Sequence, residues 1–363
     1  MTEAAREFTY AAQAVRVVFG AGSLRHLERE LDALAVDRPV VLGTPRSEPA
    51  RRLAARLGIR SAGLFAGAVM HVPQAVVDEA LAFVRQRQAD ALIAFGGGSA
   101  IGLAKAVALA AGLPIVAIPT TYAGSEMTPV HGITRDGVKQ TGRDPRVQPR
   151  TVLYDPELGL GLPLAVSVTS ALNAMAHAVE GLYAQDGNPV MDLVAHEGIR
   201  ALAAAIPALH RDAADLGARS DALYGAWLAG TVLGNVGMAL HHKLCHALGG
   251  SFGLPHADVH AVILPHAVAF NAPAAPAAML RISDALRVDP AKTTAAQALH
   301  ALARDHGAPV SLKALGMAGS DLDRAADLVV SRPYWNPRPA GPERRADVRA
   351  LLQRAFDGHA PAA

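Results

Sequence analysis

The stretch Ala91-Leu-Ile-Ala-Phe-Gly-Gly-Gly-Ser-Ala-Ile-Gly-Leu-Ala-Lys105 decides the fold. It opens with five apolar residues, which are typical of a buried strand, and three glycines follow directly. Ser99 can cap the helix that the remaining residues predict. Because glycines let a backbone approach a phosphate and a helix N-terminus offers free N–H groups, the stretch predicts a strand, a pyrophosphate-binding turn and a helix. A tight turn without a ligand is the alternative, and the glycine spacing differs from the GxGxxG pattern of ordinary Rossmann enzymes.

Further short apolar runs surround this stretch, at residues 17–19, 39–42 and 114–118, and each is followed by glycine or proline. Between them lie segments with helical spacing, at residues 49–57 and 73–88. Short uncharged strands that alternate with helices predict βαβ units, and therefore a parallel sheet covered on both faces. Residues 131–160 are charged and rich in turn residues, so we predict a hairpin region there at which the chain leaves the sheet.

The pattern changes after Pro163, where β-branched runs nearly vanish and Ala, Leu and His recur at helical spacing. We therefore expect an α/β dinucleotide-binding domain with a parallel sheet over residues 1–160 and an all-helical catalytic domain over residues 161–363. Residues 222–240 carry no charge and approach the length of a membrane span. Their glycines favour instead a buried helix against which neighbouring helices pack closely.

Composition limits the possible partners. Lys and Arg number 34 against 32 Asp and Glu, and a net charge of +2 is too small to attract nucleic acid or an anionic membrane by bulk electrostatics. Hydrophobic residues make up 51% of the 363, which is enough for a sizeable core. Cys245 is the only cysteine, and the first residues lack the basic start and apolar core of a signal peptide. We therefore expect a cytoplasmic protein without disulfides.

A second loop with ligand-binding character follows the run at residues 114–118 and reads Pro119-Thr-Thr-Tyr-Ala-Gly-Ser-Glu-Met-Thr128. Its hydroxyls and small residues come at the end of a strand, where open α/β sheets bind ligands. Taken alone, the loop suits a solvated surface equally well. Two such loops at successive strand ends favour a nucleotide crevice.

Histidines are concentrated in residues 241–266, which hold six of the 15 in the chain: His241, His242, His246, His256, His260 and His266. Upstream, Asn173 and His177 are four residues apart, as are His242 and His246, so each pair lies on one face of a helix. A single histidine on an apolar helix is usually a core residue. Several that come from different segments predict an active site.

Two kinds of ligand suit this cluster. Asn173, His177, His242 and His256 have the spacing of a metal site, but they supply three neutral imidazoles and an amide, with no carboxylate to offset the charge of a divalent ion. Together with Lys243, the same imidazoles could instead hold carboxylates. A partly protonated histidine would also suit a general acid near neutral pH.

Two neighbours of the cluster have other expected roles. Glu180 follows His177 by three residues, and we expect its carboxylate to orient a histidine. Cys245 lies between His242 and His246, and successive residues of a helix point about 100° apart. We therefore expect Cys245 to face away from the cluster and to be unreactive.

At these residues the sequence resembles the iron-containing alcohol dehydrogenase superfamily, whose fold is shared with glycerol dehydrogenase and dehydroquinate synthase. The resemblance covers almost the whole chain, from Phe19-Gly-Ala-Gly22 to Pro333-Tyr-Trp-Asn-Pro-Arg338. Within the superfamily the chain is similar to the maleylacetate reductases. The segments that carry this similarity are Ala68-Val-Met-His-Val-Pro73, Gly98-Ser-Ala-Ile-Gly-Leu-Ala-Lys105, Gly137-Val-Lys-Gln-Thr-Gly-Arg-Asp144, Asn173-Ala-Met-Ala-His177 and His241-His-Lys-Leu-Cys-His246.

Two positions depart from the wider superfamily. Its metal-dependent members carry Asp where this chain has Asn173, and usually Asp where it has Gly102. Both changes are expected of maleylacetate reductases, so the resemblance implies an enzyme without a metal. The remaining metal-ligand positions, His177, His242 and His256, are still histidine.

The resemblance also implies which residues meet the ligands. The residues expected at NADH or NADPH are Gly96, Gly97, Gly98, Ser99, Thr120 and Thr121, with Ser125, Gly43 and Thr44 added from loops at the same strand ends. The residues expected to bind a small dicarboxylate substrate are Asn173, His177, His256, Arg338 and Tyr122. His246, which matches the catalytic-site histidine of the family, is expected to be catalytic together with His242 and Lys243.

The implied reaction is reduction of the carbon–carbon double bond of maleylacetate to 3-oxoadipate by NADH or NADPH, in the breakdown of aromatic compounds, by a homodimer. Hydride adds to an alkene conjugated to a ketone, so donors must stabilise charge on the ketone oxygen and a proton must reach carbon. A metal-dependent alcohol dehydrogenase and a lyase in the manner of dehydroquinate synthase stay open as alternatives. The histidines disfavour a nucleotide-binding protein without catalysis.

Overall fold

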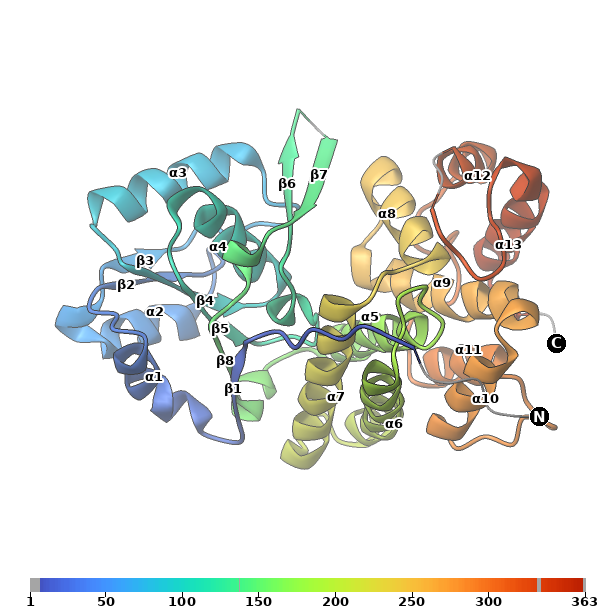
Figure 1. Ribbon diagram of the computed structural model, residues 1–363, viewed down its shortest axis with the longest axis horizontal. Helices are drawn as coiled ribbons and strands as arrows, with labels where there is room; N and C mark the ends of the chain where they lie inside the picture. The colour runs from blue at the N-terminus through green and yellow to red at the C-terminus, as the bar shows by residue number, and fades with distance from the viewer. Residues whose placement is uncertain (1–6, 137, 332–333, 362–363) are drawn as a thin grey trace. The chain divides into compact units, whose positions relative to one another are not determined.

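The computed structural model describes residues 7–136, 138–331 and 334–361 (Figure 1). Residues 137 and 333, which begin two of the segments quoted above, lie outside this described part. The chain divides into two compact units. The α/β unit comprises Ala14–Pro163 and Asp212–Leu223, and the helical unit comprises the described residues of Met1–Gln13, Leu164–Arg211 and Tyr224–Ala363.

A six-stranded parallel sheet forms the centre of the α/β unit, with the strand order β1-β8-β5-β4-β2-β3. The four strands expected from apolar runs are confirmed to within one residue at each end. They are β1 (Arg16–Phe19), β2 (Pro39–Leu42), β4 (Ala91–Gly96) and β5 (Ile115–Pro119), and β3 (Gly63–Phe65) and β8 (Thr151–Tyr154) complete the sheet.

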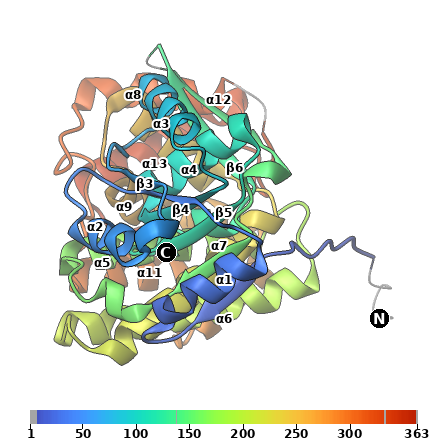
Figure 2. The same ribbon diagram turned by 90° about the vertical axis from the view of Figure 1, so that its left-hand side faces the viewer.

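Helices cover both faces of this sheet, as its uncharged strands predict (Figures 1 and 2). The helices are α1 (Leu27–Ala33), α2 (Glu48–Arg56), α3 (Gln74–Gln86) and α4 (Gly98–Ala111). Val40 and Leu42 of β2 pack in a core shared with α3 and α4, whereas Val41 packs with α1 and α2. Successive residues of a strand point to opposite faces, so one short run supplies both cores.

The segment 131–160 is partly as expected. β6 (Val130–Arg135) and β7 (Val138–Arg143) form an antiparallel hairpin, which Figure 1 shows in green. The expectation that the chain leaves the sheet here is wrong for β8, because this strand lies between β1 and β5 with all four residues buried. The apolar part of β8 is short and lies directly between the charged residues Arg150 and Asp155, so the sequence does not show it as an apolar run.

The helical unit is all-α, as expected. Its helices are α5 (Leu164–Gly181), α6 (Pro189–Arg211), α8 (Leu240–Phe252), α9 (His256–Asn271), α10 (Pro276–Ala285), α11 (Ala295–Asp305), α12 (Leu322–Val330), α13 (Arg345–Asp357) and the greater part of α7 (Leu216–Asn235). Every residue of α5 from Ser167 to Gly181 is buried. Polar side chains on this helix therefore need partners inside the protein.

The uncharged stretch at residues 222–240 is not one helix, because α7 ends at Asn235 and α8 begins at Leu240. The expected burial is confirmed by residues such as Ala226 and Val232, which are fully covered. Glycine permits close packing here, since an ideal Cβ on Gly225 would lie 2.6 Å from Cγ of Leu202. In the described part of the chain no single helix is long and apolar enough to cross a membrane; α7 and α8 pass that test only as a pair bent by 97°.

Candidate active site

The glycine turn of the α/β unit forms the start of α4. Gly96 has a φ of +142°, a conformation that side chains other than glycine rarely adopt, and Gly97 is the N-cap residue. Gly98 is exposed, and an ideal Cβ on it would have no described atom within 4 Å. The first N–H groups of a helix have no partner within the helix. This turn therefore has the geometry of an anion site.

The second loop packs against this turn. The backbone N–H of Thr120 donates to the carbonyl oxygen of Gly96 at 3.1 Å. An ideal Cβ on Gly97 would lie only 2.8 Å from Oγ1 of Thr121, so glycine allows the two loops to approach. Thr120 and Thr121 are both half-buried. The two loops lie side by side at neighbouring strand ends, which is the arrangement that a nucleotide crevice needs.

Strand order adds a third loop to this edge of the sheet. The chain runs from β2 outward to β3 and returns to β4 on the other side of β2. The loops after β2 and β4 then enter α2 and α4, which cover opposite faces. Open α/β sheets bind nucleotides at such a switch point. Gly43 and Thr44 follow β2 directly, and an ideal Cβ on Gly43 would lie 2.9 Å from Cβ of Ala50.

Two residues of the second loop are less accessible than their expected roles require. Tyr122 is 1% exposed, and its hydroxyl accepts a hydrogen bond from the fully buried Arg219 at 3.1 Å. Burial raises the pKa of Tyr122. The structure thus gives its predicted contact with substrate no support. Ser125 is half-buried, and its carbonyl oxygen accepts a hydrogen bond from Lys105 at 2.5 Å.

In the helical unit, α5, α8 and α9 bring six histidines together: His177, His241, His242, His246, His256 and His260. The rings of His177 and His242 stack with centroids 5.0 Å apart. His246 lies one turn along α8, with its ring centroid 6.2 Å from that of His242. His256 begins α9 and lies 4.4 Å from the ring of His260. The cluster is therefore a single constellation drawn from three helices.

His260 is the member to which sequence reasoning gave no role. Its fully buried ring lies 5.1 Å from His242, 4.7 Å from His241 and 6.2 Å from His177, measured between centroids. It touches more members of the cluster than any other described histidine except His242. The four-residue spacing from His256 was the signal that could have identified it, because it matches that of His242 and His246.

Glu180 orients a histidine, as expected. Its Oε2 lies 2.7 Å from Nδ1 of His242, and the carboxylate also accepts the backbone N–H groups of Ala239 at 2.9 Å and His241 at 2.7 Å. Glu180 of α5 therefore caps the N-terminus of α8 and fixes the ring of His242 at once. Because Nδ1 is held, Nε2 of His242 is the atom left to meet a ligand.

Several buried polar atoms of the histidine cluster have no hydrogen-bond partner among the described residues. Among the described residues, Oδ1 of Asn173, Nδ1 of His177 and Nε2 of His242 have none, although all three side chains are less than 8% exposed. Nε2 of His260 is also without a partner in the described structure. Buried polar groups are normally hydrogen-bonded, so these atoms mark where a bound ligand would be recognised.

The expected charge of the cluster needs correction. Burial, reinforced by neighbouring histidines, lowers the pKa of His177, His241 and His260 well below the usual value. These three rings are neutral at pH 7, so they act as hydrogen-bond partners and not as cations. Sequence reasoning overlooked this because the depth of burial at 177, 241 and 260 is a property of the packed helices.

Cys245 is fully buried, and its Sγ lies 3.6 Å from Nε2 of His241. Cys245 therefore contacts His241, a member of the cluster, which corrects the expectation that it faces away from the cluster. Burial raises the pKa of its thiol well above the usual range, in agreement with an unreactive cysteine. His241 Nε2 lies 2.9 Å from Nδ1 of His260, so one nitrogen of each ring has a partner in the other.

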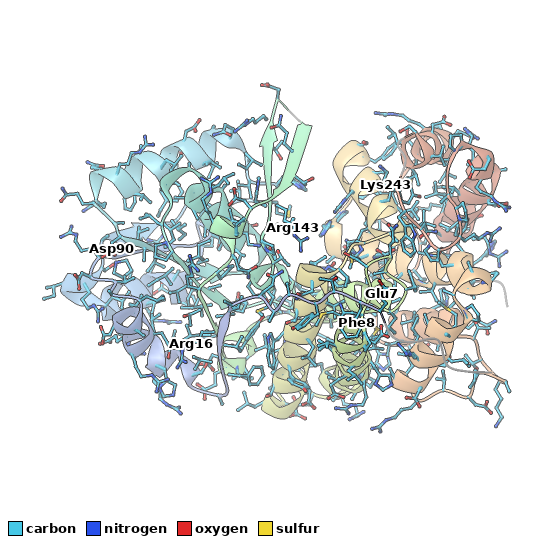
Figure 3. The ribbon with its side chains drawn as sticks, viewed as in Figure 1. Glu7, Phe8, Arg16, Asp90, Arg143 and Lys243 are labelled. Atoms are coloured by element: carbon cyan, nitrogen blue, oxygen red, sulfur yellow. The ribbon has the colours of Figure 1, made fainter. Side chains whose placement is uncertain are left out.

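Lys243 and Arg338, the two predicted cations, have partners of their own. Lys243 follows His242 on α8 (Figure 3), and its Nζ lies 5.3 Å from the ring centroid of Tyr334. The guanidinium of Arg338 lies over the ring of Phe270 at 4.4 Å and donates to Asp347 at 3.1 Å. Arg338 is therefore engaged away from the histidines, and its predicted contact with substrate gains no support.

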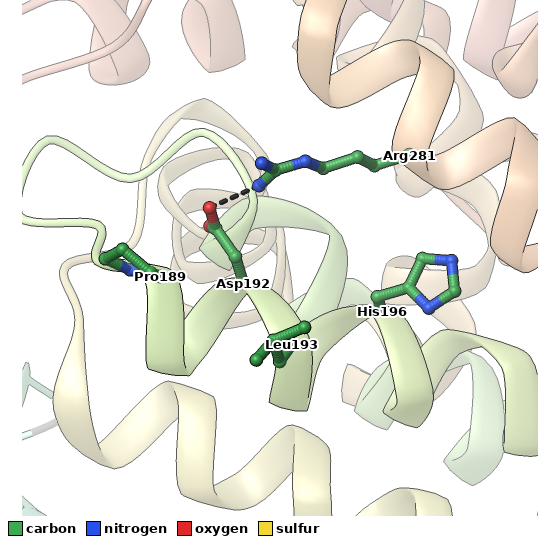
Figure 4. Close-up of a pocket in the computed structure, with 5 residues that line it drawn as sticks. All are labelled: Pro189, Asp192, Leu193, His196 and Arg281. Atoms are coloured by element: carbon green, nitrogen blue, oxygen red, sulfur yellow. Dashed lines mark hydrogen bonds and ion pairs between the residues drawn. The ribbon is translucent and has the colours of Figure 1, made fainter. Parts of the chain in front are cut away.

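The pockets found in the helical unit lie elsewhere. One of about 470 Å³ runs along α6 and is lined by Pro189, Asp192, Leu193, His196 and Arg281 (Figure 4). Asp192 and Arg281 form an ion pair across it. A second, of about 370 Å³, is lined by residues that include Val330, Tyr334, Asn336 and Glu343. Neither contains a histidine of the cluster, whose importance rests on its contacts and chemistry.

The donor set fits iron poorly. Asn173, His177, His242 and His256 offer an amide and three imidazoles, whereas iron(II) sites of this kind usually include a carboxylate. Glu180 does not supply it, because its oxygens are taken by His242 and by the start of α8. Neutral imidazoles can bind zinc without a carboxylate, so this donor set suits zinc better than iron(II).

Known protein families and solved structures match almost the whole chain. The family model described as iron-containing alcohol dehydrogenase matches residues 14–156, and that described as Fe-containing alcohol dehydrogenase family, C-terminal, matches residues 167–356. Maleylacetate reductase of Burkholderia cepacia is 57% identical over 98% of this chain and 99% of its own. The crystal structure of maleylacetate reductase from Agrobacterium tumefaciens is 48% identical, covers 98% of this chain and 100% of its own, and has a TM-score of 0.93. That of an iron-containing alcohol dehydrogenase from Corynebacterium glutamicum is 39% identical over 99% of both chains, also with a TM-score of 0.93.

Proposed function

The chain belongs to the iron-containing alcohol dehydrogenase family, and we propose that within it this protein reduces the carbon–carbon double bond of maleylacetate to 3-oxoadipate with NADH or NADPH. The observation that carries the proposal is the 57% identity with a maleylacetate reductase over nearly the full length of both chains. The polar atoms of Asn173, His177 and His242 that await a ligand support it.

The α/β unit would bind the dinucleotide. Gly96, Gly97, Gly98 and Ser99 at the start of α4 would hold the pyrophosphate through backbone N–H groups. Thr120, Thr121 and Ser125 of the second loop would contact the dinucleotide, as would Gly43 and Thr44 of the third. The switch point between β2 and β4 supports this assignment.

The helical unit would bind the dicarboxylate and stabilise charge. Hydride from the nicotinamide adds to the alkene carbon β to the ketone, and the electron pair moves to the ketone oxygen as an enolate. We assign His242 as the donor to that oxygen, because Glu180 holds Nδ1 and a proton on the unpartnered Nε2 would face the ligand. His246 is exposed on the next turn of α8 and would deliver the proton to carbon. Overall, one NADH and one proton are consumed for each maleylacetate.

Substrate binding would use the remaining candidates. Asn173, His177 and His256 would offer N–H groups to a carboxylate, and Lys243 would add a cation on α8. Tyr122 and Arg338 stay predictions, since both have partners within the protein. We propose that no metal takes part, on the ground that the donor set lacks a carboxylate ligand.

The same proposal includes the setting of the enzyme. We infer a homodimer in the cytoplasm, with no nucleic acid or membrane as partner. Within the described sheet, β1 pairs only with β8, so its outer edge offers backbone groups to a second copy. Light scattering of the purified protein measures the oligomeric state directly.

One assay tests the reaction. Purified protein is mixed with NADH and maleylacetate, the absorbance of NADH is followed, and the product is identified by mass spectrometry, with and without a chelator. Stoichiometric conversion to 3-oxoadipate that the chelator leaves intact is expected. Oxidation of simple alcohols in its place, or activity that disappears with the chelator and returns with iron, would favour the metal-dependent alternative.

A further inference from the structure

Lys105 is a buried cation on the helix that begins at the glycine turn. It lies seven residues after Gly98 on α4, and two turns of helix place the two on one face. Only 1% of its surface is exposed. Lysine is almost never buried this deeply unless its ammonium group is fully paired, so the side chain needs an explanation.

The partners of Lys105 lie in the loop between β5 and β6 and at the first residue of β6. Its Nζ donates to the carbonyl oxygens of Ser125 at 2.5 Å, Thr128 at 2.7 Å and Val130 at 2.9 Å. A fourth contact joins it to Oγ1 of Thr128 at 2.9 Å. An ammonium group has three protons, and these four acceptors surround it. No N–H group of Lys105 is left to reach a phosphate directly.

This loop is the one that carries Thr120 and Thr121 at its start. Between β5 and β6 it makes a left-handed turn at Gly124, with a φ of +75°, and its carbonyl groups turn inward toward Nζ. Buried carbonyl groups that lose their donor are costly. The shape of the loop therefore depends on the ammonium group that α4 extends into it.

A buried carboxyl group, that of Glu126, lies close enough to Lys105 to affect its pKa. Glu126 of the same loop is fully buried, and its Oε1 accepts a hydrogen bond from the hydroxyl of Tyr154 at 2.8 Å. Burial lowers the pKa of Lys105 to about 7 and raises that of Glu126, and the charge of each opposes the shift of the other. The contacts of Lys105 within the protein join two segments of the unit.

We propose that Lys105 is a positioning residue for the dinucleotide: by tying the loop 120–130 to α4, it sets the spacing between the hydroxyls of that loop and the glycine turn. The inference rests on the proposed function in so far as a nicotinamide dinucleotide binds at these two loops. It adds a residue that touches neither dinucleotide nor substrate and acts through the loop alone.

The test is Lys105→Met, which keeps the length of the side chain and removes the donor. We expect the Kd for NADH, measured by fluorescence titration, to rise about tenfold or more, because the lost contacts involve a charged donor. The kcat at saturating NADH and the KM for maleylacetate should change by less than about threefold, since the histidine cluster is untouched. A folded variant with an unchanged Kd would overturn the proposal.

Two further variants separate positioning from general stability. Thr128→Val removes one acceptor, and it should raise the Kd for NADH about threefold even if Lys105→Met does not fold. Glu30→Gln is the matched control, since Glu30 is 1% exposed and pairs with Arg16 at 2.5 Å in the same unit. It should lower the midpoint of unfolding and leave the Kd unchanged. An effect of Glu30→Gln on the Kd as large as that of Lys105→Met, or no effect of Thr128→Val, would refute the proposal.

The titration needs no turnover. A wild-type chain that binds NADH and ignores maleylacetate would therefore disprove the proposed function, and the Lys105 comparison would still decide the role of that residue. A wild-type chain that binds neither NADH nor NADPH would disprove both.

Discussion

The carboxylate of Glu180 joins the start of one helix to the side chain of His242. Oε2 of Glu180 lies 2.7 Å from Nδ1 of His242, while the same group accepts the N–H groups of Ala239 and His241. Position 180 thus decides both where α8 begins and which nitrogen of His242 faces a ligand. The first prediction tests this coupling.

Glu180→Gln should reduce kcat by about 10–100-fold, because an amide holds Nδ1 of His242 less firmly than a carboxylate and leaves the ring less well oriented. The free energy of unfolding should fall by about 1–3 kcal/mol through weaker capping of α8. Steady-state kinetics and urea unfolding measure the two effects. Glu197→Gln, which alters an ion pair with Arg200 on α6, is the control and should leave kcat unchanged. A fully active Glu180→Gln enzyme would remove His242 from the proposed role.

His246→Ala should lower kcat by about 100-fold or more if His246 delivers the proton. The residue is exposed, so the urea midpoint should stay near that of the wild type. His196→Ala on α6 is the matched control, since that residue pairs with Asp284 far along the chain from the cluster. Turnover within about threefold of the wild type would exclude His246 as the acid.

Gly98→Ala should separate stability from dinucleotide binding. Alanine is favoured over glycine in a helix by about 1 kcal/mol, and the added methyl group meets no described atom within 4 Å, so the variant should be as stable as the wild type or more stable. The Kd for NADH should nevertheless rise, because the methyl group occupies the place of the pyrophosphate. Gly250→Ala, at an open helical position of α8, should give the stability without the loss of affinity. Equal NADH affinity in Gly98→Ala would contradict the phosphate site.

Asn173→Asp should create a site for a divalent ion. The added carboxylate would complete a set with His177, His242 and His256 that suits iron(II). After incubation with iron(II) and dialysis, elemental analysis should find near-stoichiometric metal in the variant and much less in the wild type. Tight binding of iron by the wild type, together with metal-dependent turnover, would refute the proposal that no metal takes part.

Acid should destabilise the fold through His266. Its burial in α9, with smaller effects from His300 and Arg354, lowers the pKa of His266 to about 3. In the unfolded chain a histidine takes up its proton near pH 6.5, whereas the folded one stays neutral until about pH 3. The stability is therefore complete above pH 6.5 and falls as pH drops toward 3, by about 2 kcal/mol between pH 7 and 5 for this group alone.

Urea unfolding at pH 7 and pH 5 measures that loss. His266→Leu should show a smaller difference between the two pH values than the wild type, whatever its stability at pH 7. The control is His359→Ala, an exposed position, which should preserve the wild-type difference. An equal pH dependence in His266→Leu and the wild type would show that other groups cause the acid loss.

Local pattern predicted most of the α/β unit. The runs before Gly43, Gly96 and Pro119 are apolar and end at turn residues, so each strand could be placed from its own run, and a helix follows the first two. β8 could not, because its position between β1 and β5 depends on pairing with strands far away in the chain. β3 has three residues, too few for a recognisable pattern.

The candidate site was predictable where spacing along one helix decides it. Asn173 with His177, and His242 with His246, follow from four-residue steps. The neutral state of His177 and the central place of His260 depend on three helices packing together, which one segment does not reveal. Arg338 was misleading for a related reason: its charge suggested a carboxylate ligand, and the fold supplies Asp347.

The α/β unit has a discontinuous part, Asp212–Leu223, which contains the fully buried Arg219. The guanidinium of Arg219 bonds to the hydroxyl of Tyr122 and, at 3.0 Å, to the carbonyl oxygen of Leu162. Chimaeras that exchange residues 1–160 between relatives would thus combine each sheet with residues 212–223 of the other protein. An exchange that keeps this nucleotide fold intact must transplant the distant dozen residues as well.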